Sequence, residues 1–143
     1  DRYLIKTGLL EKPYYWIILP TLPGGSPMQN PKAMVEVLMH YVNRINEISA
    51  IQGDDNTQIV VCASGRASSY LTTFALLLGL HIRVGMEDSV WRWPHQDVKI
   101  KNNLETWLQT KQICELLGRE IIDPNEFRQM MKMRKPGGKL KSK

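Results

Sequence analysis

The segment Gly79–Asp88 carries the charged side chains best placed for chemistry. Read with the period of two of a β-strand, it has a charged face and an apolar face. The charged face consists of His81, Arg83, Gly85 and Glu87, and the apolar face of Ile82, Val84 and Met86. In a parallel barrel the charged face points inward, where charges must be paired or metal-bound. Glu87 and Asp88 come at the carboxyl end of this strand, where parallel α/β enzymes build their sites. The residues alone indicate either such a site or a structural ion-pair network at a strand end.

A second polar segment follows another expected strand. Ser64, Gly65 and Arg66 come directly after the apolar run Ile59–Ala63 and open the helical run Leu71–Leu78. Backbone N–H groups at a helix start attract anions, and an arginine adds a forked donor. We therefore expect these three residues to face an anionic group of a ligand. A surface arginine that caps a turn is the equally open alternative.

The elements that must position these residues alternate along the chain. Tyr14–Leu19 and Ile59–Ala63 are aromatic or β-branched runs, typical of buried parallel strands. Between them, Asn30–Pro31 predicts a helix start with an asparagine cap. The expected apolar stripe of that helix consists of Ala33, Val37, Leu38, Tyr41, Ile45 and Ile48. The order strand, helix, strand, helix indicates an α/β fold.

Two further helices are expected in the last third of the chain. Asn102–Asn103 caps the first, which ends at Gly118. Asp123 caps the second, with Glu126 at the capping-box position. The apolar residues expected to pack are Leu104, Leu108, Ile113, Leu116 and Leu117 in the first helix and Phe127, Met130 and Met131 in the second.

The run His81–Asp88 resembles the signature His-Val-Arg-Val-Gly-Leu-Glu-Asp of the β-keto acid cleavage enzymes, a family of zinc-dependent (β/α)8 barrels. The likeness extends over most of the chain. It includes Gly8-Leu9-Leu10 with Pro13-Tyr14, Pro23-Gly24-Gly25, Gly65-Arg66, Leu117–Glu120 and Asp123–Glu126. The chain departs from the signature at Met86, where the family has leucine, and at Ser89, where it has asparagine.

The resemblance implies that this chain is the C-terminal part of a TIM barrel, with about strands six to eight and their helices. Residues 1–134 would form the C-terminal half of a single domain, and 135–143 a basic flexible tail. A chain of 143 residues is shorter than the roughly 250 that such barrels need. We therefore expect a fragment that is inactive by itself.

The resemblance also implies roles for the charged residues. Glu87 would bind Zn²⁺, with the other ligands in the missing N-terminal half. Asp88 would be the general base, and Arg83 would hold it through charge-assisted bonds. The reaction would be the retro-Claisen cleavage of a β-keto acid with acetyl-CoA, giving acetoacetate and an acyl-CoA. Ser64, Gly65 and Arg66 would face a carboxylate or the coenzyme A phosphates, and family members assemble into homo-oligomers.

Charge, cysteine spacing and the length of apolar runs argue against several other classes of protein. The net charge of +5 owes much to lysines and arginines near the end of the chain, which lack the interleaved aromatic residues of nucleic-acid binders. Cys62 and Cys114 are too far apart in sequence to form a Cys-x-x-Cys pair, and both are expected to be small buried hydrophobes. Apolar runs are too short for a membrane span, so we expect a cytoplasmic protein. The alternative function is a non-catalytic α/β anion-binding module that uses Ser64–Arg66 and the tail.

Overall fold

A three-stranded parallel sheet organises the computed structural model, which describes residues 2–20 and 30–133. Strand β2 (Gln58–Cys62) lies between β1 (Tyr15–Ile18) and β3 (His81–Arg83). The register pairs Ile17 with Val60, and Val60 with His81. The parallel α/β architecture predicted from the sequence is therefore confirmed.

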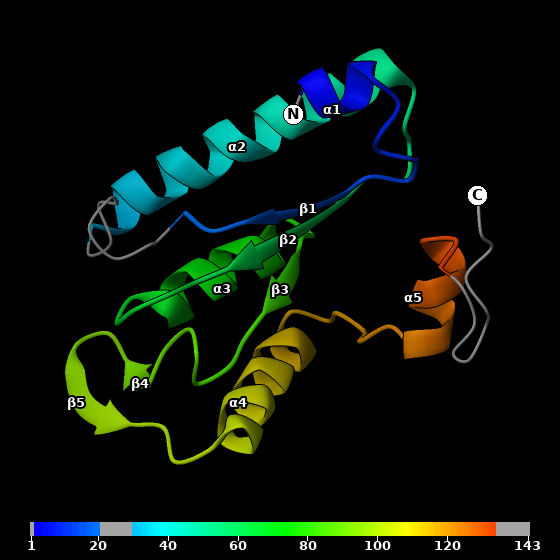
Figure 1. Ribbon diagram of the computed structural model, residues 1–143. Helices are drawn as coiled ribbons and strands as arrows, with labels where there is room; N and C mark the ends of the chain where they lie inside the picture. The colour runs from blue at the N-terminus through cyan, green and yellow to red at the C-terminus, as the bar shows by residue number, and fades with distance from the viewer. Residues whose placement is uncertain (1, 21–29, 134–143) are drawn as a thin grey trace.

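Helices α2 (Pro31–Gln52) and α3 (Ser68–Leu77) cover one face of this sheet (Figure 1). Their buried side chains form the core with the strand residues that point the same way. The core residues are Met34, Leu38, Val42 and Ile45 of α2, Ile59 and Val61 of β2, and Ala63, Ala67, Leu71 and Ala75. Ile82 of β3 packs against them. Burial of this apolar surface is the main force that holds the helices on the sheet.

The buried stripe of α2 differs from the predicted one. Leu38 and Ile45 are buried as expected, but Met34, Val42 and Ser49 complete the stripe, and Tyr41 is 45% exposed. The buried residues recur every three or four positions from Met34 to Ser49, so the helix is rotated relative to the prediction. The predicted cap is confirmed, because the Asn30 side chain accepts hydrogen bonds from the N–H groups of Lys32 and Ala33.

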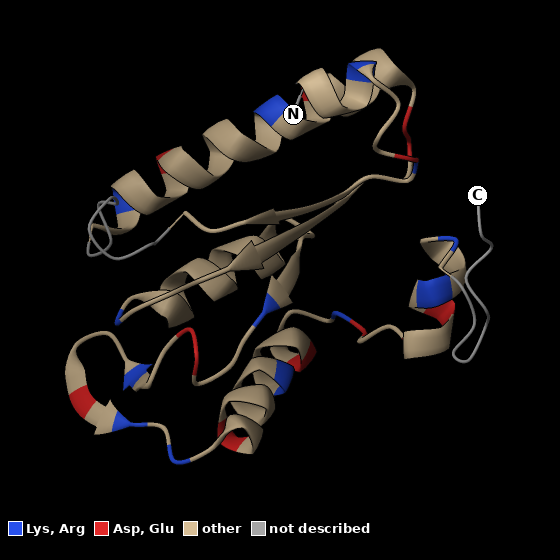
Figure 2. Cartoon of the chain, viewed as in Figure 1, with Lys and Arg blue, Asp and Glu red and all other residues tan. Residues whose placement is uncertain are grey.

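The opposite face of the sheet is more open. Tyr15 and Ile17 of β1 are 44% and 48% exposed, whereas Val60 and Cys62 of β2 are buried. Helix α5 (Pro124–Met130) covers part of this face, where Phe127 makes edge contacts with the rings of Tyr15 and His81. Of the three strands as described, Arg83 is the one charged residue, and its pairing with Cys62 places it on this face; Figure 2 marks lysines and arginines in blue along the chain.

The third strand is shorter than the sequence pattern predicts. It ends at Arg83, and Gly85 to Ser89 form a turn in which the N–H groups of Asp88 and Ser89 both donate to the carbonyl of Gly85, at 3.1 Å each. Glu87 is therefore a turn residue, and its predicted place on the inner strand face is wrong. Alternation alone does not distinguish a long strand from a short strand followed by a glycine-containing turn.

The segment after this turn forms a small second sheet. Strands β4 (Trp91–Trp93) and β5 (Gln96–Lys99) pair antiparallel as a hairpin. Helix α4 (Asn103–Leu116) follows, with the Asn102 cap as predicted. Of its residues Cys114 is buried, while Leu104 and Leu116 are 61% and 87% exposed, so the predicted apolar side of α4 is largely uncovered.

Two smaller findings complete the described fold. Helix α1 (Arg2–Lys6) precedes β1. The Asp123 side chain caps α5 by accepting from the N–H groups of Asn125 and Glu126.

Within residues 2–20 and 30–133 no helix has the length and apolar character that a membrane span needs. The family-like segment Pro23–Gly25 and the basic tail at 135–143 lie outside the described residues.

Candidate active site

Asp88 is the best-buried carboxylate at the carboxyl end of the sheet. Its side chain is 9% exposed, and it lies in the turn after β3 beside the end of β2. Oδ1 accepts a hydrogen bond from the thiol of Cys62 at 3.1 Å and lies 3.4 Å from Nη2 of Arg83. Oδ2 is also buried, and within the described structure it has no hydrogen-bond partner. An unpaired buried oxygen is costly in a purely structural group, so this atom is a candidate acceptor for a proton.

Arg83 connects the two carboxylates of the turn. Its Nη2 lies 2.5 Å from Oε2 of Glu87, in addition to its contact with Asp88. The charge of Asp88, with smaller contributions from Cys62 and Glu87, raises the pKa of the Arg83 guanidinium. The structure thus brings Arg83, Glu87 and Asp88 together, as the sequence predicted.

Enclosure of this triad is less complete than expected. The side chains of Arg83 and Glu87 are 43% and 83% exposed, so they are not held inside the described part of the protein. The physical reason is that β3 is an edge strand of the described sheet and Glu87 lies in the turn beyond it. Asp88 is the member of the triad that is shielded from water.

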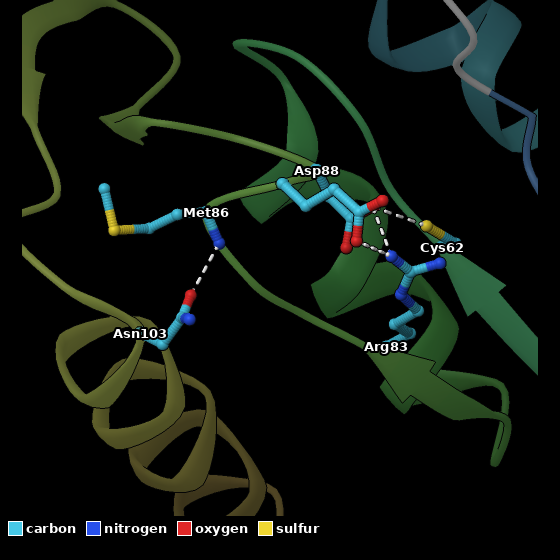
Figure 3. Close-up of polar contacts among 6 residues, drawn as sticks. Cys62, Arg83, Met86, Asp88 and Asn103 are labelled. Carbon is cyan, nitrogen blue, oxygen red and sulfur yellow. Dashed lines mark hydrogen bonds and ion pairs between the residues drawn. The ribbon is translucent and has the colours of Figure 1, made fainter.

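Cys62 contacts Asp88, and the sequence patterns did not reveal this contact. It was expected to be a small buried hydrophobe, and it is fully buried at the end of β2. Figure 3 shows its sulfur and the Arg83 guanidinium on the same side of Asp88, with Asn103 on the other side. Burial, followed by the hydrogen bond to Asp88, raises the pKa of the Cys62 thiol to about 11. The thiol is therefore protonated at neutral pH and acts as a donor.

Backbone contacts fix the turn of Asp88 against the turn after β2. The N–H of Gly65 donates to the carbonyl of Asp88 at 2.9 Å, and the hydroxyl of Ser89 donates to the carbonyl of Gly65 at 2.9 Å. On the other side, the Asn103 side chain accepts from the N–H of Met86 at 2.8 Å. The signature segment is thus held from β2 and from α4.

The predicted anion-binding turn is engaged within the protein. Arg66 Nη2 lies 2.8 Å from Oδ1 of Asp97, and Nη1 donates to the carbonyl of Gln96 at 3.2 Å. Its guanidinium carbon lies 3.7 Å from the ring centroid of Trp91. Arg66 therefore fastens the β4–β5 hairpin onto the turn after β2, and its role toward a ligand stays a prediction.

The described residues offer a metal ion few ligands. They contain no group of three or more His, Cys, Asp or Glu side chains that could hold a metal ion. His81, whose Nε2 lies 2.6 Å from the side-chain oxygen of Gln58, serves a cross-strand contact instead. Glu87 has an exposed carboxylate and fits a metal as the donor of one ligand. A catalytic zinc usually takes three protein ligands, so this part of the chain does not form a complete zinc centre.

Two spaces adjoin the triad. Asp88 and Thr106 help to line a cavity of about 30 Å³ between α3, α4 and the hairpin, which is too small for an organic substrate. A larger groove of about 450 Å³ lies on the open face of the sheet, where Val60, Arg83 and Phe127 contribute to its lining. The groove, with Arg83 in its wall, is the better place for a ligand.

Comparisons with known proteins agree with the signature. A profile of the β-keto acid cleavage enzyme family matches residues 2–133. A 3-keto-5-aminohexanoate cleavage enzyme of Fusobacterium nucleatum is 33% identical over 75 residues, which are 52% of this chain and 27% of that protein. A protein of the same name from Acetoanaerobium sticklandii is 26% identical over 143 residues, covering 92% of this chain and 51% of that protein. The chain spans about half the length, or less, of these curated relatives.

Proposed function

This chain belongs to the family of β-keto acid cleavage enzymes, and from that premise we propose that it contributes the general base and one zinc ligand of such an enzyme. The observation that carries the proposal is the juxtaposition of Arg83, Glu87 and Asp88 at the carboxyl end of a parallel sheet. Parallel α/β enzymes place their catalytic groups at that end.

Asp88 is the residue we assign as the base. It would take a proton from the β-keto acid as the carbon–carbon bond breaks in the retro-Claisen manner. Its Oδ1 is held by Arg83 and Cys62, which leaves Oδ2 free to accept a proton. A base must be fixed close to the proton that it removes, and this arrangement supports that role.

Glu87 is the residue we assign to zinc. Its exposed carboxylate fits one coordination position, and the remaining ligands would come from residues beyond the described ones. When bound, zinc would supply polarisation of the keto oxygen of the substrate. Arg83 would keep the Glu87 carboxylate oriented, since the two groups lie 2.5 Å apart.

The partners of the reaction follow from the same proposal. Coenzyme A would receive the acyl group (R–CO) of the β-keto acid, and the acetyl group of acetyl-CoA would join the remaining CH2–COO⁻ unit to give acetoacetate. The described sheet would correspond to strands six to eight of a TIM barrel, closed by the half of the family's length that this chain does not span. The uncovered face of the sheet, with Tyr15 and Ile17, supports that placement. We expect the closed barrel to form homo-oligomers.

The test is an assay of a joined protein. In it, the N-terminal half of the Acetoanaerobium sticklandii relative precedes this chain. We expect acetoacetate to form from acetyl-CoA and 3-keto-5-aminohexanoate. Its formation should stop when zinc is chelated. The relative itself is the positive control, and the 143-residue chain alone is expected to be inactive. A joined protein that folds and binds zinc but forms no acetoacetate, with this or other β-keto acids, would contradict the proposal.

A further inference from the structure

The thiol of Cys62 stands out because it is a buried donor aimed at the proposed base. Its sulfur lies 3.1 Å from Oδ1 of Asp88, within hydrogen-bond distance, although the two residues are 26 positions apart in the sequence. Cys62 is fully buried, and the side chain of Asp88 is 9% exposed. The contact is thus shielded from competing water, which strengthens a weak donor.

The rest of the Asp88 carboxylate shows what this donor achieves. Arg83 approaches the same oxygen, Oδ1, but at 3.4 Å and from a side chain that is 43% exposed. Arg83 also pairs with Glu87, so it serves two carboxylates. A rotation of the Asp88 carboxylate out of its present plane would break the contact with the thiol and move the second oxygen, Oδ2. The thiol is a fully buried donor to Asp88, and it opposes that rotation.

We propose that Cys62 is a positioning residue, which holds Oδ1 of Asp88 and so fixes the orientation of the carboxylate that accepts the proton. This inference rests on the proposed function, because it assigns Asp88 as the base. A thiol suits the task for two reasons. It is compatible with an apolar strand interior, and it is a weaker donor than a hydroxyl, so it takes less electron density from the carboxylate.

The pKa of the thiol agrees with this role. Because burial and the bond to Asp88 raise it to about 11, Cys62 keeps its proton throughout the neutral range. A thiolate at this position would repel the Asp88 carboxylate instead of holding it. Cys62 is therefore a permanent donor under the conditions of the reaction.

The first experiment measures the hydrogen bond itself in the 143-residue chain. The S–H stretching band in the infrared spectrum moves to lower frequency when the thiol donates. In a Cys114→Ala chain, Cys62 is the remaining thiol, and we expect Asp88→Ala to move its band to higher frequency. The control is a Cys62→Ala chain, in which the band of Cys114 should be insensitive to Asp88→Ala. A Cys62 band that does not move would overturn the proposal.

The second experiment uses the joined protein. Cys62→Ala and Cys62→Ser both replace sulfur by a smaller group, but serine retains a donor. We expect Cys62→Ala to lower kcat about tenfold with KM within about twofold, and Cys62→Ser to stay within about threefold of the parent kcat. Equal loss in both variants would overturn positioning and indicate a packing role. A parent protein that folds, binds zinc and shows no turnover would instead overturn the proposed function, and the positioning role with it.

Discussion

Two buried aspartates lie at opposite ends of the parallel sheet, and their surroundings differ in kind. Asp54 precedes β2 at the amino end, where Oδ2 accepts from the N–H of Tyr14 at 2.8 Å and from the hydroxyl of Thr57 at 2.7 Å. Its Oδ1 accepts from the N–H of Asn56 at 3.3 Å. Asp88, at the carboxyl end, has one oxygen held by Cys62, and its other oxygen has no hydrogen-bond partner among residues 2–20 and 30–133.

The difference separates a structural carboxylate from a candidate catalytic one. Burial by itself would raise the pKa of Asp54, but the hydrogen bonds from Tyr14, Thr57 and Asn56, with the charge of Lys12, outweigh it and lower the pKa. Asp54 ties β1 to the turn before β2, and both of its oxygens are used. A carboxylate oxygen that accepts no structural hydrogen bond is the better placed to accept a proton from a substrate.

The largest expected effect concerns catalysis. In the joined protein, Asp88→Asn should lower turnover by between about 100-fold and 10,000-fold, because an amide oxygen is not a useful base. Zinc content should stay near that of the parent, since Asp88 is not the assigned ligand. Asp54→Asn is the matched control, and its activity per folded molecule should be unchanged. Full activity of Asp88→Asn would contradict its assignment as the base. Loss of zinc from this variant would contradict the assignment of separate roles to Glu87 and Asp88.

For the free energy of unfolding, we expect Asp54 rather than Asp88 to be the more important of the two aspartates. Asp54→Asn should lower the free energy of unfolding by about 2–3 kcal/mol at pH 7, because the amide nitrogen that replaces one carboxylate oxygen cannot accept the hydrogen bonds made there. Urea unfolding of the 143-residue chain measures this quantity. The lowered pKa gives stability that is present above the ordinary value of 3.8 and is lost as pH falls through the folded value. The gap between parent and variant should therefore close in acid, and a constant gap would contradict the assigned cause.

A smaller effect is expected in alkali, at the other end of the sheet. The pKa of Cys62 is raised from 9.0 to about 11, so the folded state holds its proton longer than the unfolded state. The stabilising contribution is complete below pH 9 and is lost as pH rises toward 11. Cys62→Ala should reduce this loss, whereas Cys114→Ala should not. Unfolding titrations from pH 8 to pH 11 provide the measurement, and identical slopes in all three chains would argue against a buried Cys62 thiol.

The smallest change in stability is expected at Glu87. Its side chain is 83% exposed, and exposed ion pairs contribute little, so Glu87→Gln should leave the melting temperature within about 2 °C. In the joined protein the same substitution should lower zinc affinity, because it removes a charged ligand. Zinc content after dialysis measures this effect. Retention of zinc would show that Glu87 is a partner of Arg83 and nothing more.

The sequence predicted best those features that depend on local chemistry. The caps at Asn30, Asn102 and Asp123 and the strands around Tyr15 and Ile59 depend on neighbours in the chain, and the structure has them. The rotation of α2 was wrong because several of its apolar residues lie outside the buried row, so the sequence does not select Met34 over Ala33. The packed sheet makes that choice.

In the candidate site too, contacts between residues close in sequence were predicted and contacts that depend on the packed fold were not. Arg83 and Asp88 are five residues apart, and their contact was predicted from spacing and family resemblance. The contact of Cys62 with Asp88 depends on strand order, and no local pattern contains it. Asp54 was likewise missed, because its partner Tyr14 comes 40 residues earlier. The position of Glu87 was wrong because the alternating pattern runs on past Arg83 through Gly85, where the chain turns.

The backbone link between Gly65 and Asp88 has an evolutionary consequence. Gly65 has a φ of +80°, which other residues adopt at a cost, and its N–H donates to Asp88 while its carbonyl accepts from Ser89. Any other residue at position 65 would therefore strain a backbone that is hydrogen-bonded to the turn of Asp88. Substitutions at 65 and 89 should be epistatic, so a mutant library that varies them one at a time would miss the tolerated combinations.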